Sequence, residues 1–304
     1  MFRRPAYLVT AIAAVGLAAT GCSQRSEPVE ELHVEYPVTV RGSGDAPLLL
    51  AKPPERIVAL DAGSAELIDA LGARDRLVGV PSGVTLSGGS SVREVVKDTG
   101  KIDVAAVAAL EPDLIVATPD TDRVDVAQVE QRTDAPVYLQ PSRTIDDVER
   151  AALELGFLVD EPAAARQLVG MIEESVAEIE GRLTTVDPVR TFVDTGFFIT
   201  VPDGSLLGDL LRRAHGTNVA ASSAGLGPVP VEELVSADPE IYLTTSDSGV
   251  SLASLQRNPE TDELTAVREG RVTILPAELV MRPGPNVAKG LQALAVALHP
   301  DAFR

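Results

Sequence analysis

Short polar side chains follow several apolar runs that are typical of buried strands. In a parallel sheet the carboxyl ends of neighbouring strands meet at one edge, and ligands bind in the crevice beyond that edge. Hydroxyl and carboxylate groups at these positions suit hydrogen bonding to a small polar molecule. The candidate ligand contacts of this kind are Asp61, Ser64, Ser82, Thr118, Asp120 and Ser246.

Two aromatic residues and one arginine in the second half complete the candidate ligand contacts. Phe197 and Phe198 are adjacent, so on a strand one would meet a ligand and the other the core. Arg282 could pair with a carboxylate or phosphate in fork geometry. Simpler interpretations stay open, because Asp61 and Ser64 also suit helix caps. Ser82 suits a surface loop, and Arg282 a solvated surface.

Catalytic and metal-site patterns are missing from the sequence. The three histidines lie in distant segments, whereas a zinc or manganese site needs three or four close ligands. No Gly-x-Ser-x-Gly elbow occurs. Gly100-Lys101 is followed by Ile102 instead of Ser or Thr, which excludes a phosphate loop. We therefore predict no catalytic residue, no metal site and no cofactor.

Apolar strands alternate with amphipathic helices along the chain, which predicts an α/β fold with mostly parallel sheets covered on both faces. A β-hairpin is expected first, over 33–50. The expected strands are 56–60, 77–80, 114–117, 137–139, 190–193, 197–199, 241–244 and 272–275. The expected helices are 65–71, 104–110, 124–132, 145–155, 206–214, 231–236, 252–256 and 287–298.

A longer helix interrupts this rhythm at the middle of the chain. Helical spacing of apolar residues runs over 162–183, and Pro162 suits the first helical position. The segments 107–120 and 234–247 share one pattern of helix, proline with acid, strand and polar loop, so the two halves look like related lobes. The predicted Rossmann-like lobes are 33–160 and 188–304, joined by a linking helix within 161–187.

The amino terminus carries the signature of a processed, lipid-anchored protein. Two arginines precede an apolar run of ~13 residues, which is too short for a membrane span of ~20 residues. The run ends in Ala19-Thr20-Gly21-Cys22, which resembles the bacterial lipobox, although Ala stands at position 19 where Leu is usual. We predict a signal peptide over 1–21, a lipid anchor with palmitate-type chains on Cys22, and a polar tether over 22–32. Cys22 is the only cysteine, so no internal disulfide can form.

The formal charge of the chain is −19. Removal of residues 1–21 takes away two arginines and no acids, so the mature chain is near −21. Nucleic acid is therefore not expected as a partner, because phosphate binding needs basic patches.

Several short motifs, in this order, resemble the siderophore, haem and vitamin B12 class of ABC-importer substrate-binding proteins. The resemblance implies two lobes joined by a long rigid helix, a ligand cleft between them, and delivery of the solute to a transmembrane permease dimer driven by a cytoplasmic ATPase. It implies an extracytoplasmic monomer that is not an enzyme. The motifs are 54–60, 66–72, 109–117, 218–220, 233–241, 270–275 and 297–300.

The resemblance also implies permease docking through one acidic residue on each lobe. Glu66 matches the first position, and Asp209 is the nearest acid to the second, where Arg212 stands. The chain has no tryptophan and ten Phe plus Tyr, whereas haem or a corrinoid favours aromatic walls. The sequence therefore favours a polar ferric siderophore as solute. The competing hypothesis is a non-transporting lipoprotein that binds another envelope protein, with its two lobes facing each other across a dry, filled interface.

Overall fold

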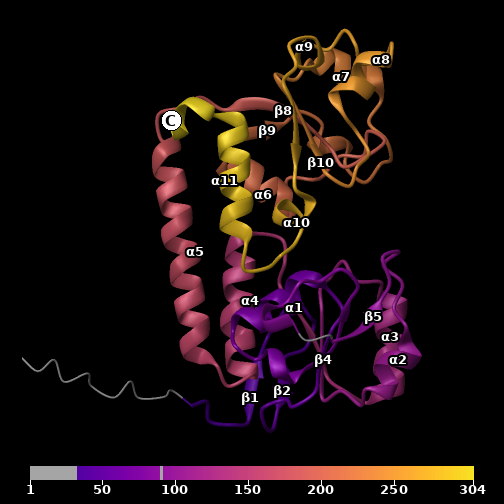
Figure 1. The fold of residues 1–304 in the computed structure, drawn as a ribbon, viewed down its shortest axis with the longest axis vertical. Helices are drawn as coiled ribbons and strands as arrows, with labels where there is room; N and C mark the ends of the chain where they lie inside the picture. The colour runs from indigo at the N-terminus through magenta and orange to yellow at the C-terminus, as the bar shows by residue number, and fades with distance from the viewer. Residues whose placement is uncertain (1–32, 90–91) are drawn as a thin grey trace, which may run out of the picture. The chain divides into compact units, whose positions relative to one another are not determined.

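The computed structural model describes residues 33–89 and 92–304. The first lobe opens with an antiparallel hairpin of β1 (Val38–Val40) and β2 (Leu48–Leu50), and continues as a five-stranded parallel sheet in the order β5-β4-β3-β6-β7 (Figure 1). Its sheet strands are β3 (Ile57–Ala59), β4 (Leu77–Pro81), β5 (Arg93–Val96), β6 (Leu114–Ala117) and β7 (Val137–Leu139). Its helices are α1 (Ala62–Ala70), α2 (Val104–Ala109), α3 (Arg123–Thr133) and α4 (Ile145–Leu158).

The second lobe is a four-stranded parallel sheet in the order β11-β10-β8-β9. Its strands are β8 (Val189–Asp194), β9 (Gly216–Asn218), β10 (Ile241–Thr245) and β11 (Val272–Leu275). Its helices are α6 (Leu206–Arg213), α7 (Val231–Ala237), α8 (Leu252–Arg257), α9 (Thr265–Arg268), α10 (Ala277–Val280) and α11 (Val287–Leu298). Short 3-10 helices occupy Arg74–Arg76, Ser87–Gly89, Ala221–Ser223 and Pro300–Phe303.

Helix α5 (Pro162–Leu183) links the two sheets in the chain and coincides with the helix expected over 162–183. Pro162 stands at its start, where a missing N–H costs nothing. The helix packs against both α4 and α11, with α4 beside its first part and α11 beside its last part (Figure 1). None of the helices in the described ranges is long and apolar enough to cross a membrane.

One hydrophobic core runs through both lobes. The inner faces of the two sheets, together with α1, α4, α5, α6 and α11, contribute to a single cluster of buried side chains. Each sheet has a second, separate cluster on its other face. Strands β3 and β6 are buried along their whole length, as expected for parallel strands covered on both faces.

The predicted α/β class and parallel sheets are confirmed, with one wrong strand. Residues 197–199 form a turn, because the Asp194 carboxylate accepts a hydrogen bond from the Gly196 N–H at 2.8 Å and reverses the chain. Phe197 and Phe198 both have positive φ, 54° and 60°. The sequence analysis also missed β5, β9, α9 and α10, which are short or carry polar residues.

An ion network around the buried Asp209 carboxylate ties three helices together. The Asp209 side chain on α6 is only 5% exposed and accepts from the Arg213 Nε at 3.1 Å. It also accepts from the backbone N–H of Ile145, the first residue of α4, at 3.1 Å. Arg213 reaches Glu180 on α5 at 3.0 Å and also pairs with Asp146 on α4. The first lobe, the linking helix and the second lobe therefore meet at one arginine.

Replacing Asp209 should destabilise the protein strongly. Asp209→Ala leaves the Ile145 N–H without its acceptor and removes one of the three carboxylates around the Arg213 guanidinium, so we expect the free energy of unfolding to fall by about 2 to 3 kcal/mol. Urea denaturation followed by circular dichroism measures this loss. The control is Glu178→Ala, which removes the exposed Glu178–Arg182 pair on α5 and should cost no more than about 0.5 kcal/mol. A loss below about 1 kcal/mol for Asp209→Ala would show that the network does not hold the lobes.

Candidate functional site

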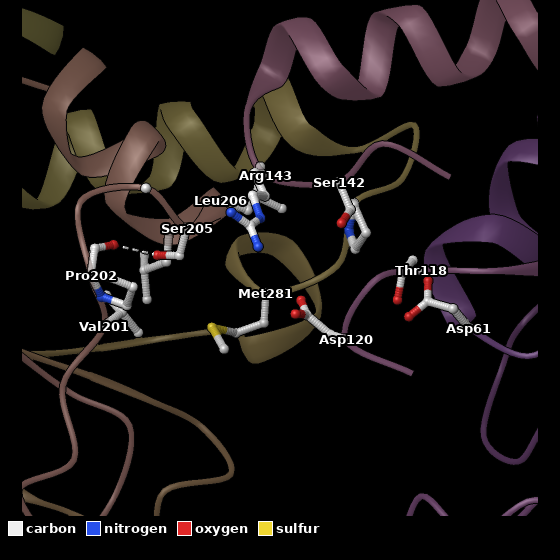
Figure 2. A pocket seen from close by; sticks show the side chains of 13 residues that line it. Asp61, Thr118, Asp120, Ser142, Arg143, Val201, Pro202, Ser205, Leu206 and Met281 are labelled. Atoms are coloured by element: carbon white, nitrogen blue, oxygen red, sulfur yellow. Dashed lines mark hydrogen bonds between the residues drawn. The ribbon is translucent and has the colours of Figure 1, made fainter. Parts of the chain in front are cut away.

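A cavity of about 510 Å³ lies between loops of the two lobes. Figure 2 shows Asp61 and Thr118 at one end, Val201, Pro202 and Ser205 at the other, and Asp120, Arg143 and Met281 between them. The first lobe contributes Asp61, Thr118, Asp120, Ser142 and Arg143. The second lobe contributes Val201, Pro202, Gly204, Ser205, Leu206, Leu207, Met281 and Pro283.

Asp61 follows β3 and is the N-cap of α1. Its Oδ1 accepts from the Ser64 N–H at 3.2 Å, which satisfies one free donor of the first turn. Burial raises the pKa of Asp61 above its ordinary value, against the opposing effects of the Ser64 and Gly63 N–H groups and of Arg282. Asp61 is also partly exposed and lines the cavity, so the carboxylate combines a structural task with a place in the cavity wall.

Thr118 and Asp120 belong to the loop after β6. Thr118 is 3% exposed, and its backbone N–H donates to the Thr121 hydroxyl at 3.1 Å. This bond folds the loop back, with Thr118 buried and Asp120 exposed, and both line the cavity. Three of the predicted ligand contacts, Asp61, Thr118 and Asp120, are therefore together.

Two lining residues that the sequence analysis missed follow β7. The Ser142 side chain is buried, and its Oγ has no hydrogen-bond partner within the described part of the chain. Arg143 is exposed, and its backbone N–H donates to Asp147 at 3.0 Å. The sequence carries a signal for these two residues, because segment 140–144 directly follows a predicted strand, as segments 61–64 and 118–121 do. A buried hydroxyl without a partner at a cavity wall suits hydrogen bonding to a ligand or water.

The second lobe contributes mainly apolar surface. Val201, Leu206 and Met281 line the cavity. The Ser205 hydroxyl donates to the Pro202 carbonyl at 2.7 Å and accepts from the Gly208 N–H at 3.1 Å, as the N-cap of α6 (Figure 2). Among the described lining residues none is aromatic and none is a histidine. The hydrogen-bonding groups are thus concentrated on the first lobe.

Four predicted polar contacts and both predicted phenylalanines do not line this cavity. Ser64 is fully buried and its Oγ has no partner among the described residues. The Ser82 hydroxyl donates to Asp98 at 2.5 Å, and the Ser246 hydroxyl accepts from the Ala277 N–H at 3.1 Å. Arg282 donates through Nη1 to Glu66 Oε1 at 2.8 Å, so its guanidinium is engaged with the protein.

The two phenylalanines lie on a turn and not on the expected strand, and both are outside the cavity wall. Phe197 is 86% exposed on the turn after β8. Phe198 packs against the outer core of the second lobe. Neither lines the cavity, so contact of Phe197 with a ligand would need a molecule that extends beyond it.

The two predicted docking residues have different surroundings. Glu66 is 15% exposed and paired with Arg282. Asp209 is buried and held by Arg213 and the Ile145 N–H, so its carboxylate is not available to a permease arginine. The docking hypothesis for Asp209 does not agree with this structure, because the acid is part of the internal ion network. Cys22 lies outside the described residues.

Comparison with known proteins gives the family. A model described as "Periplasmic binding protein" matches residues 57–279. The chain belongs to this family. Members of this class are substrate-binding proteins of ABC transporters. They bind small ligands outside the cytoplasm and work with a permease and an ATPase. They are a class of binding proteins and not of enzymes.

Three similar proteins illustrate the match. The uncharacterised ABC transporter substrate-binding lipoprotein YvrC of Bacillus subtilis is 25% identical, over 96% of this chain and 96% of its own length. A cobalamin-binding protein of Halobacterium salinarum is 25% identical, over 96% of this chain and 83% of its own. The crystal structure of Helicobacter pylori CeuE in a nickel–histidine complex has a TM-score of 0.76 at 20% identity, covering 88% of this chain and 89% of that one.

The pKa of Asp61 predicts how one variant changes stability with pH. A carboxyl whose folded pKa is raised stabilises the protein fully below its unfolded pKa of about 3.9 and loses that stabilisation as pH rises through the folded pKa. Asp61→Asn keeps the cap but cannot ionise. We therefore expect the stability of Asp61→Asn relative to the parent protein to increase from pH 4 to pH 7, measured by urea denaturation at each pH.

Two further variants control this experiment. Asp61→Ser also caps without ionising and should give the same trend. Asp238→Asn should give the opposite trend, because hydrogen bonds from Thr265 lower the pKa of Asp238. If the relative stability of Asp61→Asn fell between pH 4 and pH 7, the carboxylate would be stabilising and our account of its burial would be wrong.

Proposed function

We propose that this protein captures an uncharged or cationic metal chelate with amide groups around its edge, while anchored to the membrane by lipid on Cys22. The observation that carries the proposal is the interlobe cavity, with two carboxylates, one guanidinium and an unpartnered buried hydroxyl among its described lining residues. Carboxylates accept hydrogen bonds and donate none. Asp61 and Asp120 therefore suit ligand N–H groups.

Charge argues against an anionic solute. Asp61, Asp120 and Arg143 together give the wall a formal charge of −1 when ionised, and the whole chain is strongly negative. A ferric tricatecholate carries several negative charges and haem carries two propionates, so both would meet an unfavourable potential. Haem also takes a His, Tyr, Cys or Met ligand, and among the described lining residues only Met281 is of these types.

Two solute types share the required chemistry. Cobalamin carries amide side chains around its corrin ring, and ferric trihydroxamate siderophores carry amide and hydroxamate groups without net negative charge. The cobalamin-binding relative supports the first. The polar wall without aromatic side chains supports the second, which is the solute that the sequence favours. The open cavity also supports solute capture over the alternative of a non-transporting lipoprotein with a filled cleft.

Docking on a permease is proposed through the first lobe only. Glu66 is partly exposed at α1, and its side chain could exchange one guanidinium for another. The second-lobe docking acid is left unassigned, because Asp209 is buried. We propose that the protein acts as a monomer, with one cavity for each permease.

A solute screen tests the cavity chemistry. Cobalamin and ferrioxamine should raise the melting temperature, whereas haem and ferric enterobactin should not. A ligand at 100 times its dissociation constant stabilises by about 2.7 kcal/mol, which corresponds to a shift of about 5 °C for a protein of this size. Differential scanning fluorimetry or calorimetry measures the shift.

Matched serine variants connect a positive result to the cavity. Ser142→Ala removes a hydroxyl that has no hydrogen-bond partner among the described residues and should weaken binding of the active probe about tenfold. Ser82→Ala removes a hydroxyl that lies away from the cavity lining and should leave binding unchanged. Stabilisation by haem or the tricatecholate instead of the two favoured probes would refute the charge argument.

The anchor is tested independently of the solute. Cys22→Ser removes the thiol to which lipid would be attached, so the protein should leave the membrane fraction. Fractionation of cells followed by immunoblotting measures this change. A chain that stays in the membrane fraction after this substitution would exclude lipid anchoring at Cys22.

A further inference from the structure

A short segment of the second lobe is fastened to the first lobe beside the cavity. This segment, Met281–Gly284, connects α10 to α11, and we call it the strap. It lies directly on the start of α1. A Cβ at Gly63 would stand 2.7 Å from the Pro283 carbonyl oxygen, and one at Gly284 would stand 3.2 Å from the Gly63 Cα. The two backbones therefore meet where neither residue can carry a larger side chain without a shift.

Two side-chain contacts fix the strap in addition to this backbone contact. The buried Gln140 Nε2 donates to the Pro283 carbonyl at 2.7 Å. The Arg282 Nη1 donates to Glu66 Oε1 at 2.8 Å. The side chains of the ion pair are 34% and 15% exposed, respectively, so solvent and other molecules can reach it.

The strap also forms part of the cavity wall. Met281 and Pro283 line the cavity together with Asp61, which is two residues before Gly63. Arg282, between them, turns to Glu66. The Glu66–Arg282 pair therefore contributes to the position of this wall, together with the Gln140 hydrogen bond and the backbone contact at Gly63.

We infer that Arg282 is a positioning residue, and that Glu66 couples solute release to docking by exchanging Arg282 for a cationic side chain of the permease. When Glu66 is taken by the partner, the strap loses its ion pair and the cavity wall loosens. The coupling rests on the proposed function, whereas the loosening is a property of this chain alone. A partly exposed pair suits exchange, because its net contribution is small compared with that of a buried pair.

The first experiment needs no solute. Cys22→Ser removes the only cysteine, so cysteines placed at the exposed positions Val124, on the first lobe, and Met281, on the strap, can be spin-labelled specifically. Double electron–electron resonance measures the distribution of distances between the two labels. Arg282→Gln and Glu66→Gln should each broaden this distribution. The control Arg182→Gln, from an exposed pair on α5, should not. Unchanged distributions in both strap variants would overturn the positioning role.

The second experiment measures solute retention with cobalamin, and with ferrioxamine as the alternative probe. Arg282→Gln and Glu66→Gln should each speed dissociation about tenfold, and the double variant should be no faster than either. Effects that multiply in the double variant would show that the two residues act separately and would overturn the inference. If no probe binds the parent protein, the proposed solute is wrong, while the spin-label result still decides the role of the strap.

The third experiment separates the strap from the partner. Both variants break the Glu66–Arg282 pair. Only Arg282→Gln keeps the Glu66 carboxylate, which can then pair with the permease. In cells supplied with saturating probe, Arg282→Gln should support uptake, and Glu66→Gln should lose at least tenfold. Equal uptake by the two variants would overturn the exchange at Glu66.

Discussion

The arrangement of the lobes depends on the ion network around Arg213. This guanidinium forms ion pairs with carboxylates on α4, α5 and α6. The three helices belong to the first lobe, the linking helix and the second lobe, respectively. Burying the Asp209 carboxylate is costly unless every lone pair finds a donor, and here two arginines and a backbone N–H supply those donors. A network of this kind is satisfied in one relative position of three helices. It therefore fixes where the strand ends of the two sheets face each other.

The shared hydrophobic core also holds the two lobes together. Apolar residues of α4, α5, α6 and α11 form one cluster with the inner faces of both sheets, so the lobes cannot separate without exposing that surface to water. The cavity lies beyond the carboxyl ends of β3, β6 and β7 on one lobe and after β8 on the other. Its polar half comes from loops of the first lobe, and its apolar half from the start of α6 and the strap. A binding site with different chemistry on its two walls results from joining two similar lobes.

The sequence predicts most of this fold because its signals are local. Helix α5 has helical spacing along its whole length, and β6 is an unbroken apolar run. Strand β9, Gly-Thr-Asn, has no such signal, and its pairing with β8 comes from the tertiary structure. The same limit applies to the site. Asp61, Thr118 and Asp120 follow clear strands, whereas the pairing of Arg282 with Glu66 joins residues 216 positions apart. Asp209 was misread because an acid on an amphipathic helix does not reveal its burial.

Electrostatics connects the strap to the cavity wall. The charge of Arg282 lowers the pKa of Asp61, in opposition to burial and to the charge of Glu66, which raise it. Burial of Asp61 disfavours its ionised form, and a fold that keeps such a carboxylate gives up stability for a site. Movement of Arg282 away from Glu66 and Asp61 would remove a positive charge that favours the ionised carboxylate. Loosening of the strap would then weaken ligand binding in two ways. Met281 and Pro283 would shift, and Asp61 would become a poorer acceptor for ligand N–H groups.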